Sequence, residues 1–197
     1  MQSSLVVGSG FGGIASALRL RSLGFEVHVI ERQDDLGGRA QVFEVDGYRH
    51  DAGPTVITAP FLFDELFELF GERRQDHVEF RELTPWYRFI FPDGDHFDYG
   101  GTLEDTLAEI HRIEPKDQQG YQSLIAHSKE LFDIGFAKLA HQPFHEIKTM
   151  AKQIPHLAKL RSDRSVWDMV CKYLSHDKLR QAFSIQPLLV GGSPFDT

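Results

Sequence analysis

Hydrophobic positions near the start of the chain follow first a strand period and then a helix period. The apolar runs Leu5–Val7 and Val27–Ile30 predict two strands. Between the runs, apolar residues recur at helical spacing: Ile14, Ala17, Leu18 and Leu20. Gly24 follows the last of them and predicts the end of a helix. A strand, a helix and a second strand in this order predict a parallel βαβ unit.

Further along, the pattern predicts hairpins first and helices afterwards. Residues 42–50 alternate around Asp46-Gly47, a two-residue hairpin turn, and a helix opened by Thr58 and Pro60 is expected to stop at Gly71. Strands are expected over 78–82, 86–91 and 95–99, with a turn over 92–94 between the last two. Tyr87, Phe89 and Phe91 are expected to share one face. Helices are expected over 102–113, 115–140, 165–174 and 176–183, with a loop over 188–194. Thr102 with Asp105 is expected to cap the first of these helices, and Ser165 the third.

The turn between the first strand and the first helix reads Gly8-x-Gly10-x-x-Gly13. Gly8 permits the tight turn, Gly10 lets the backbone approach a pyrophosphate, and Gly13 lets the helix pack closely on the strand. Glu31 ends the second strand 18 residues after Gly13, close to the spacing of roughly 20 for an acid that binds ribose hydroxyls. Such an acid repels a 2′-phosphate, so the motif predicts NAD or FAD rather than NADP.

Two later stretches add candidate ligand contacts. Gly37-Gly38-Arg39 places a flexible turn near the same phosphates, and the Arg39 guanidinium can donate two parallel hydrogen bonds to them. Arg39 is also explained as a surface arginine beside Asp34 and Asp35. Gly53-Pro54 fixes a bend where a flat ligand can approach the backbone, and on spacing alone it is equally explained as a simple turn.

Composition narrows the class of protein. The chain has 197 residues with 41% hydrophobic and 25% charged residues, as is usual for a globular protein. Its net charge of −8 argues against nucleic acid as a partner. The single cysteine, Cys171, suits a reducing cytoplasm and is expected to be a small apolar residue. We find no apolar run long enough to span a bilayer. We expect no signal peptide, because the first strand begins at the start of the sequence. We also expect no metal site, since Pro143 separates His141 from His145 and no third ligand is evident.

Residues 138–164 differ in charge from the rest of the chain. Six basic residues face only Glu146 and Asp163, a local charge of +4, and apolar residues are interleaved with them. Such a mixture suits contact with anionic lipid, but an ordinary amphipathic helix with a solvated basic face explains it equally well.

After Glu31 we find hairpins and helices but no further βαβ unit. A doubly wound nucleotide-binding sheet needs more parallel strands than two, so we expect this chain to be the front part of a longer protein.

Together, several motifs resemble the FAD-dependent amine oxidase and desaturase superfamily, and within it the bacterial-type phytoene desaturase branch. The superfamily motifs are the glycine-rich turn through Glu31, Gly37-Gly38-Arg39-Ala40 and Asp51-Ala52-Gly53-Pro54-Thr55. The branch is indicated by Thr84–Arg88, Leu157–Leu160 with Arg164–Val166, and Leu179–Ser184 with Leu189–Phe195.

This resemblance implies an incomplete Rossmann-like FAD-binding domain over 1–76, of α/β class. It also implies the start of an α+β substrate- and membrane-binding domain over 77–197, mostly helical after 102. The expected FAD contacts are Gly8, Gly10, Phe11, Gly12, Gly13, Glu31, Arg32, Gly38, Arg39, Gly53, Pro54, Thr55 and Val56. Within this set, the resemblance places Gly53–Val56 near the flavin. No catalytic residue is assigned.

The implied activity is desaturation of phytoene towards neurosporene or lycopene, with oxygen or a quinone reoxidising the flavin. The implied location is cytoplasmic, peripherally bound to the inner face of the membrane, and this favours a membrane role for residues 138–164. Alternatives of the same fold are a diapophytoene desaturase, a carotenoid isomerase or a ketolase. A prenyl-lipid carrier without redox chemistry is a further alternative, and retention of Glu31 and Gly37-Gly38-Arg39 argues against it.

Overall fold

The computed structural model describes residues 2–53, 56–135 and 164–196. The chain divides into two compact units, Met1–Arg81 and Glu82–Thr197, which we call the first unit and the second unit. This division lies close to the boundary predicted between residues 76 and 77. The functions expected for the two parts stay predictions.

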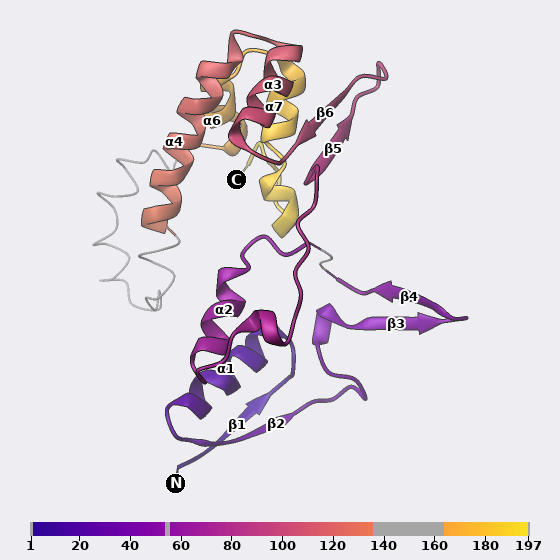
Figure 1. The fold of residues 1–197 in the computed structure, drawn as a ribbon, viewed down its shortest axis with the longest axis vertical. Helices are drawn as coiled ribbons and strands as arrows, with labels where there is room; N and C mark the ends of the chain where they lie inside the picture. Colours follow the sequence, from indigo (N-terminus) through magenta and orange to yellow (C-terminus); the bar gives the residue numbers. More distant parts are fainter. Residues whose placement is uncertain (1, 54–55, 136–163, 197) are drawn as a thin grey trace. The chain divides into compact units, whose positions relative to one another are not determined.

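The first unit opens with the predicted βαβ arrangement (Figure 1). Strands β1 (Ser3–Val7) and β2 (Glu26–Ile30) pair in parallel, and α1 (Phe11–Ser22) connects them. Gly24 follows α1 with a φ of 88°, and its N–H donates to the carbonyl of Arg21 at 3.0 Å. A glycine in the left-handed region ends the helix where the sequence predicts.

The two faces of the β1–β2 sheet differ in how well they are covered. Val6 and Val27 are half-buried on the face that packs against α1, whereas Leu5, Val7 and Ile30 are exposed. Alternate residues of a strand point to opposite faces, so the apolar residues of the second face are exposed together. In the part of the chain that the structure describes, this sheet has two strands.

A hairpin follows, as the Asp46-Gly47 turn predicts. Strands β3 (Val42–Val45) and β4 (Tyr48–Asp51) pair antiparallel, and both turn residues have positive φ, 53° and 78°. Positive φ at both central residues is the geometry of a type I′ turn. Every residue of the two strands is exposed.

The first unit continues with α2 (Phe61–Glu68) and the short 3₁₀ helix η2 (Arg74–Asp76). Pro60 is the N-cap of α2, and Gly71 follows the helix with a φ of 72°. The helix is shorter than predicted. The phenyl rings of Phe11 and Phe63 meet edge to face at 5.6 Å, so α2 packs against the start of α1.

The strand predicted over 78–82 is wrong. The N–H of Val78 donates to the carbonyl of Arg74 at 2.7 Å, and the guanidinium of Arg74 donates to the carbonyl of Val78 at 2.9 Å. Both backbone groups of Val78 are therefore used by a turn and a side chain, and Phe80 packs under the Arg74 guanidinium at 4.1 Å. A strand needs a partner, and none of the described strands pairs with this segment.

The second unit begins with a hairpin of β5 (Tyr87–Ile90) and β6 (His96–Tyr99). The turn over 92–94 lies between them as predicted. The expected inner face is confirmed: Phe91 is buried and Tyr87 and Phe89 are half-buried, whereas Ile90 on the other face is exposed.

The helices described in the second unit are α3 (Leu103–Ile113), α4 (Asp117–Gly135), α6 (Val166–Tyr173), α7 (Asp177–Phe183) and the 3₁₀ helix η3 (Gln186–Val190). The predicted caps are present, because Thr102 and Asp105 form a capping box and Ser165 caps α6. Helix α4 begins two residues after Pro115, and η3 replaces part of the loop expected over 188–194. The end expected for α4 near residue 140 lies outside the described residues.

These elements enclose a core of aromatic and aliphatic side chains. Its fully buried members include Phe97, Ile110, Val170, Leu174 and Leu179. The Phe183 ring meets the rings of Phe97, Tyr99 and Tyr121 at 4.8–5.5 Å between centroids. The hairpin therefore packs on the helices through its inner face.

The carboxylate of Asp117, at the start of α4, is buried in this unit. It accepts hydrogen bonds from the N–H and hydroxyl of Ser175 and from the N–H of His176, at 2.7–2.9 Å. These bonds satisfy the backbone between α6 and α7 and tie the two helices to α4.

The predicted membrane segment 138–164 lies outside the described residues, except for its last residue. None of the helices described is long and apolar enough to cross a membrane.

Candidate functional site: the glycine-rich loop and Glu31

The glycine-rich turn of the first unit has the geometry that its spacing predicts. Gly8 has a φ of 98°, in the left-handed region, and its N–H donates to the carbonyl of Ile30 at 2.7 Å. A Cβ on Gly13 would lie 2.0 Å from the carbonyl oxygen of Gly8. Only glycine therefore permits this approach of α1 to the end of β1.

The start of α1 offers unpaired hydrogen-bond donors. Gly10 is the N-cap residue and no side chain caps the helix. The N–H groups of the first turn, on Phe11, Gly12 and Gly13, have no intrahelical acceptor and carry the positive end of the helix dipole. A Cβ on Gly12 would have no atom within 4 Å. Open space beside free donors is what a pyrophosphate requires.

Glu31 lies where β2 ends and turns its carboxylate towards the loop. Oε2 accepts from the N–H of Ser9 at 2.7 Å and from the Ser9 hydroxyl at 2.6 Å. Oε1 accepts from the N–H groups of Arg32 and Gln33 at 2.7 and 2.9 Å. The bonds from Gln33 and Ser9 lower the pKa of Glu31 to about 2, so the carboxylate is ionised at neutral pH.

The structure brings the Gly37-Gly38 turn against the glycine-rich loop. Gly37 forms a parallel bridge with Gly10, and its N–H donates to the carbonyl of Ser9 at 3.1 Å. Gly38 has a φ of 60°, and a Cβ on it would lie 3.0 Å from the Cα of Gly10. The two turns, separate in sequence, therefore lie against each other, and Gly10, Gly37 and Gly38 are half-buried there.

Arg39 follows in η1 (Gly38–Ala40), with its side chain exposed. Its guanidinium has no hydrogen-bond or ion-pair partner within the described ranges, and its exposure agrees both with a phosphate contact and with the alternative of a surface arginine. A Cβ on Gly53 would lie 2.0 Å from the carbonyl oxygen of Arg39. The segment that contains Gly53 thus runs against η1.

For the remaining predicted FAD contacts, the structure shows no hydrogen bond to the glycine-rich loop among the described residues. Val56 is half-buried, the Arg32 side chain is exposed, and Pro54 and Thr55 lie outside the described residues. Sequence reasoning missed Ser9, whose side chain is 1% exposed. Its position between two loop glycines was visible in the motif, but nothing in the spacing indicates that its hydroxyl reaches Glu31.

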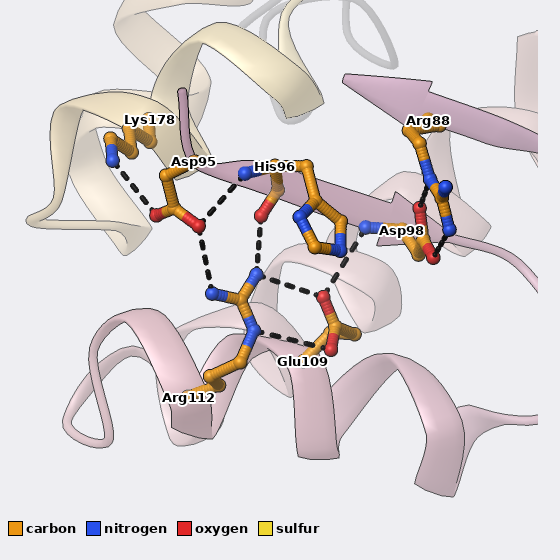
Figure 2. A network of polar contacts seen from close by, with 7 residues as sticks. All are labelled: Arg88, Asp95, His96, Asp98, Glu109, Arg112 and Lys178. Atoms are coloured by element: carbon orange, nitrogen blue, oxygen red, sulfur yellow. Dashed lines mark hydrogen bonds and ion pairs between the residues drawn. The ribbon is translucent and has the colours of Figure 1, made fainter. Parts of the chain in front are cut away.

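A second polar cluster lies in the second unit (Figure 2). Arg112 of α3 donates to Asp95 at 3.0 Å, to Glu109 at 3.0 Å and to the carbonyl of His96. Lys178 of α7 pairs with Asp95 at 2.8 Å, and its hydrogen bond lowers the pKa of Asp95. The turn of the β5–β6 hairpin is thereby joined to two helices.

The same cluster continues along the hairpin. Arg88 binds Asp98 through two hydrogen bonds of 2.6 and 2.7 Å, which lower the pKa of the Asp98 carboxyl. The N–H of Asp98 donates to Glu109 at 3.3 Å. Each charged side chain of this cluster has an opposite partner, so the cluster is a structural network and offers no free charge to a ligand. We find no group of three metal-ligating side chains within the described ranges.

Among known proteins, a domain model matches within the first unit and curated proteins match along the whole chain. A family model described as a NAD(P)-binding Rossmann-like domain matches residues 6–72. The lycopene-forming phytoene desaturase of Pantoea ananas is 42% identical over 197 residues, which are 100% of this chain and 40% of that protein. The predicted resemblance to the phytoene desaturases is confirmed. The neurosporene-forming phytoene desaturase of Cereibacter sphaeroides is 35% identical over 193 residues, 98% of this chain and 37% of that protein.

The chain spans about two fifths of the length of these curated relatives. Among solved structures, a putrescine oxidase bound to putrescine is 20% identical and matches with a TM-score of 0.53, covering 93% of this chain and 37% of that one. At this identity the match shows the fold alone. It agrees with the Rossmann-like α/β class predicted from the sequence.

Proposed function

We propose that this chain provides the adenosine- and pyrophosphate-binding part of an FAD-dependent carotenoid desaturase that acts on phytoene. The similarity to lycopene- and neurosporene-forming phytoene desaturases along essentially the whole chain supports the substrate class. Because the chain spans about two fifths of those relatives, the activity is proposed for the longer protein.

The observation that carries the proposal is the arrangement around the glycine-rich loop. Free N–H groups at the start of α1 suit a pyrophosphate, and the ionised Glu31 at the end of β2 suits a ribose with both hydroxyls free. An ionised carboxylate repels a 2′-phosphate. The site therefore favours FAD or NAD over NADP, and the Gly37-Gly38-Arg39 turn beside the loop favours FAD.

In the proposed complex, Gly8, Gly10, Phe11, Gly12 and Gly13 line the pyrophosphate and Glu31 binds the ribose, with Arg32 beside it. Gly38 and Arg39 lie beside the phosphates. The Arg39 guanidinium is exposed, and its planar fork of N–H donors can bind two phosphate oxygens at once. Gly53, which lies against η1, is expected near the flavin end, together with Pro54, Thr55 and Val56.

Bound FAD would supply the oxidation: it would accept a hydride from one C–H bond while the neighbouring carbon loses a proton to water, and an external acceptor, oxygen or a quinone, would then take the two electrons. A polyene has no polar group for an acid or base to hold. The protein's own contribution is accordingly to bind, orient and exclude water, and we assign no catalytic residue.

We further propose that the protein works at the inner face of the membrane, peripherally bound from the cytoplasm. Phytoene dissolves in lipid, and the +4 charge of residues 138–164, interleaved with apolar residues, suits anionic headgroups. The support comes from the sequence of this segment.

The test uses the full-length protein. Glu31→Gln should weaken FAD binding by about 1–3 kcal/mol, measured by titration of the apoprotein, because a charged acceptor is lost from the ribose site. The parent protein, loaded with FAD and given phytoene in liposomes, should form a coloured product. Consumption of diapophytoene with phytoene left unchanged would make the substrate wrong. A protein that binds no flavin would point instead to a lipid carrier.

A further inference from the structure

Ser9 is nearly fully buried, and its side chain is directed at the predicted ribose-binding acid. Its hydroxyl donates to Oε2 of Glu31 at 2.6 Å, and its own N–H donates to the same oxygen at 2.7 Å. The hydroxyl oxygen in turn accepts from the N–H of Gly37 at 3.3 Å. One small side chain thus joins the glycine-rich loop, the end of β2 and the Gly37-Gly38 turn.

The hydrogen bonds to Glu31 use its acceptor capacity completely. A carboxylate has about four in-plane lone-pair positions. Two donors from Ser9 occupy those of Oε2, and the N–H groups of Arg32 and Gln33 occupy those of Oε1. A ribose hydroxyl can therefore bind Glu31 only if one of these four donors withdraws.

The four donors differ in their freedom to withdraw. Three are backbone N–H groups whose directions follow from the fold of the loop and of the end of β2. The fourth is a hydroxyl, which leaves Oε2 when the Ser9 side chain rotates about its Cα–Cβ bond. That rotation gives up the 3.3 Å bond from the Gly37 N–H, which still donates to the Ser9 carbonyl at 3.1 Å. Withdrawal of the hydroxyl is the smallest rearrangement that frees Oε2.

We propose that the Ser9 hydroxyl is a placeholder for one ribose hydroxyl of the adenine dinucleotide, holding Glu31 in place without ligand and yielding Oε2 when the ribose binds. Ser9 is then a positioning residue that stabilises the ligand-free loop and weakens ligand binding. This inference rests on the proposed dinucleotide site. The placeholder and a simple structural role predict opposite results on ligand affinity.

The test replaces Ser9 by alanine in the full-length apoprotein. Ser9→Ala should lower the melting temperature without ligand, because a buried hydrogen bond to a charged group is lost. The same variant should bind FAD about three- to tenfold more tightly, since ribose no longer displaces the hydroxyl. Ser22→Ala is the matched control, because the Ser22 hydroxyl donates only within α1, to the carbonyl of Arg19. Weaker or unchanged FAD binding by Ser9→Ala would overturn the proposal.

Deoxy ligands identify the competing hydroxyl. ADP, 2′-deoxy-ADP and 3′-deoxy-ADP are titrated into the parent and Ser9→Ala proteins. The gain in affinity should persist for ADP and disappear for one of the two deoxy analogues. A gain kept in full by both analogues would show that Ser9 does not compete with the ribose.

A double-mutant cycle with Glu31→Gln separates this inference from the proposed function. If Glu31→Gln leaves FAD binding unchanged, the assignment of Glu31 to the ribose is wrong, and the placeholder falls with it. If Glu31→Gln weakens binding while Ser9→Ala gives no gain, only the placeholder is wrong. With both correct, Ser9→Ala should have no effect on affinity in the Glu31→Gln background.

Discussion

The two units of this chain differ in the contacts that stabilise each of them internally. The second unit buries a contiguous set of aromatic and aliphatic side chains, with Phe97, Ile110 and Leu179 inaccessible to solvent. In the first unit, the described residues that are buried are Ser9 and Arg74, both polar. Its close contacts are between backbones, such as those of Gly13 with Gly8 and of Gly38 with Gly10.

This difference agrees with the dinucleotide-binding function proposed for the first unit. A closed core stabilises the second unit through the removal of apolar surface from water. A dinucleotide site needs exposed backbone donors and little side-chain cover, so the first unit places glycines where a core would have large residues. Its open sheet face, with Leu5 and Val7, adds little stability in the chain as described.

The largest effect should come from the core of the second unit. Phe97→Ala should lower the free energy of unfolding by about 3–5 kcal/mol, because it leaves a cavity at an inaccessible position. Urea unfolding followed by tryptophan fluorescence reports on this unit, since both tryptophans, Trp86 and Trp167, belong to it. Ile90→Ala in the same hairpin is the control, at a residue that is 76% exposed. Equal losses in the two variants would contradict the assignment of the core.

The second-largest effect should come from a side chain added at a close contact between two backbone segments. Gly13→Ala places a Cβ 2.0 Å from the carbonyl oxygen of Gly8 and should displace α1 from the end of β1. Overpacking of about 1–3 kcal/mol would raise the dissociation constant for FAD in the full-length protein roughly five- to 150-fold. Titration of the apoprotein with FAD measures this change.

The matched control for that variant is Gly135→Ala, at the end of α4, where a Cβ meets no atom within 4 Å. The control should leave FAD binding unchanged. Unaltered binding by the Gly13→Ala protein would show that the loop tolerates the side chain and that the close approach is not required.

Acid should act on the first unit through Glu31. Its pKa is about 2 in the fold and near 4.5 without it, so the carboxylate stabilises the folded loop above pH 4.5 and loses this contribution as the pH falls towards 2. Between pH 7 and 5 the amide NMR signals of Gly8–Gly13 should stay unchanged. Below pH 4.5 they should broaden or shift, and the Glu31→Gln protein should lack this transition.

Asp95 in the second unit also has a lowered pKa, so acid weakens both units in the same direction. The loop amides and the tryptophans therefore have to be followed separately. A transition of the loop signals near pH 4.5–5, unaffected by Glu31→Gln, would contradict the hydrogen bonding described for Glu31.

The smallest effect should come from a valine-to-alanine substitution in the first unit, which we compare with the same substitution in the second unit. Val7→Ala should change the stability of the 197-residue chain by less than about 0.5 kcal/mol, because Val7 is 80% exposed. Val170→Ala should cost about 2 kcal/mol, because Val170 is 1% exposed. Thermal unfolding followed by circular dichroism measures both. A cost for Val7→Ala as large as that for Val170→Ala would show that the β1–β2 sheet is not open.

Elements with a local signal were predicted well. The hairpin turn at Asp46-Gly47, the cap at Thr102 and the end of α1 at Gly24 follow from the φ angles and side-chain oxygens of the residues themselves. The strand predicted over 78–82 failed because pairing depends on a partner, and Arg74 takes up the backbone groups of Val78 instead.

The candidate site likewise has some features that the sequence predicted and others that only the structure showed. The sequence by itself determined the placement of Gly8, Gly13 and Glu31, because a strand, a tight turn and a helix with an acid at the next strand end leave little freedom in it. Only the tertiary structure decided that the Gly37-Gly38 turn lies against Gly10 and that the Ser9 hydroxyl donates to the Glu31 carboxylate. These contacts join residues 22 to 28 positions apart, and their geometry depends on where two loops end in space, which spacing along the chain does not encode.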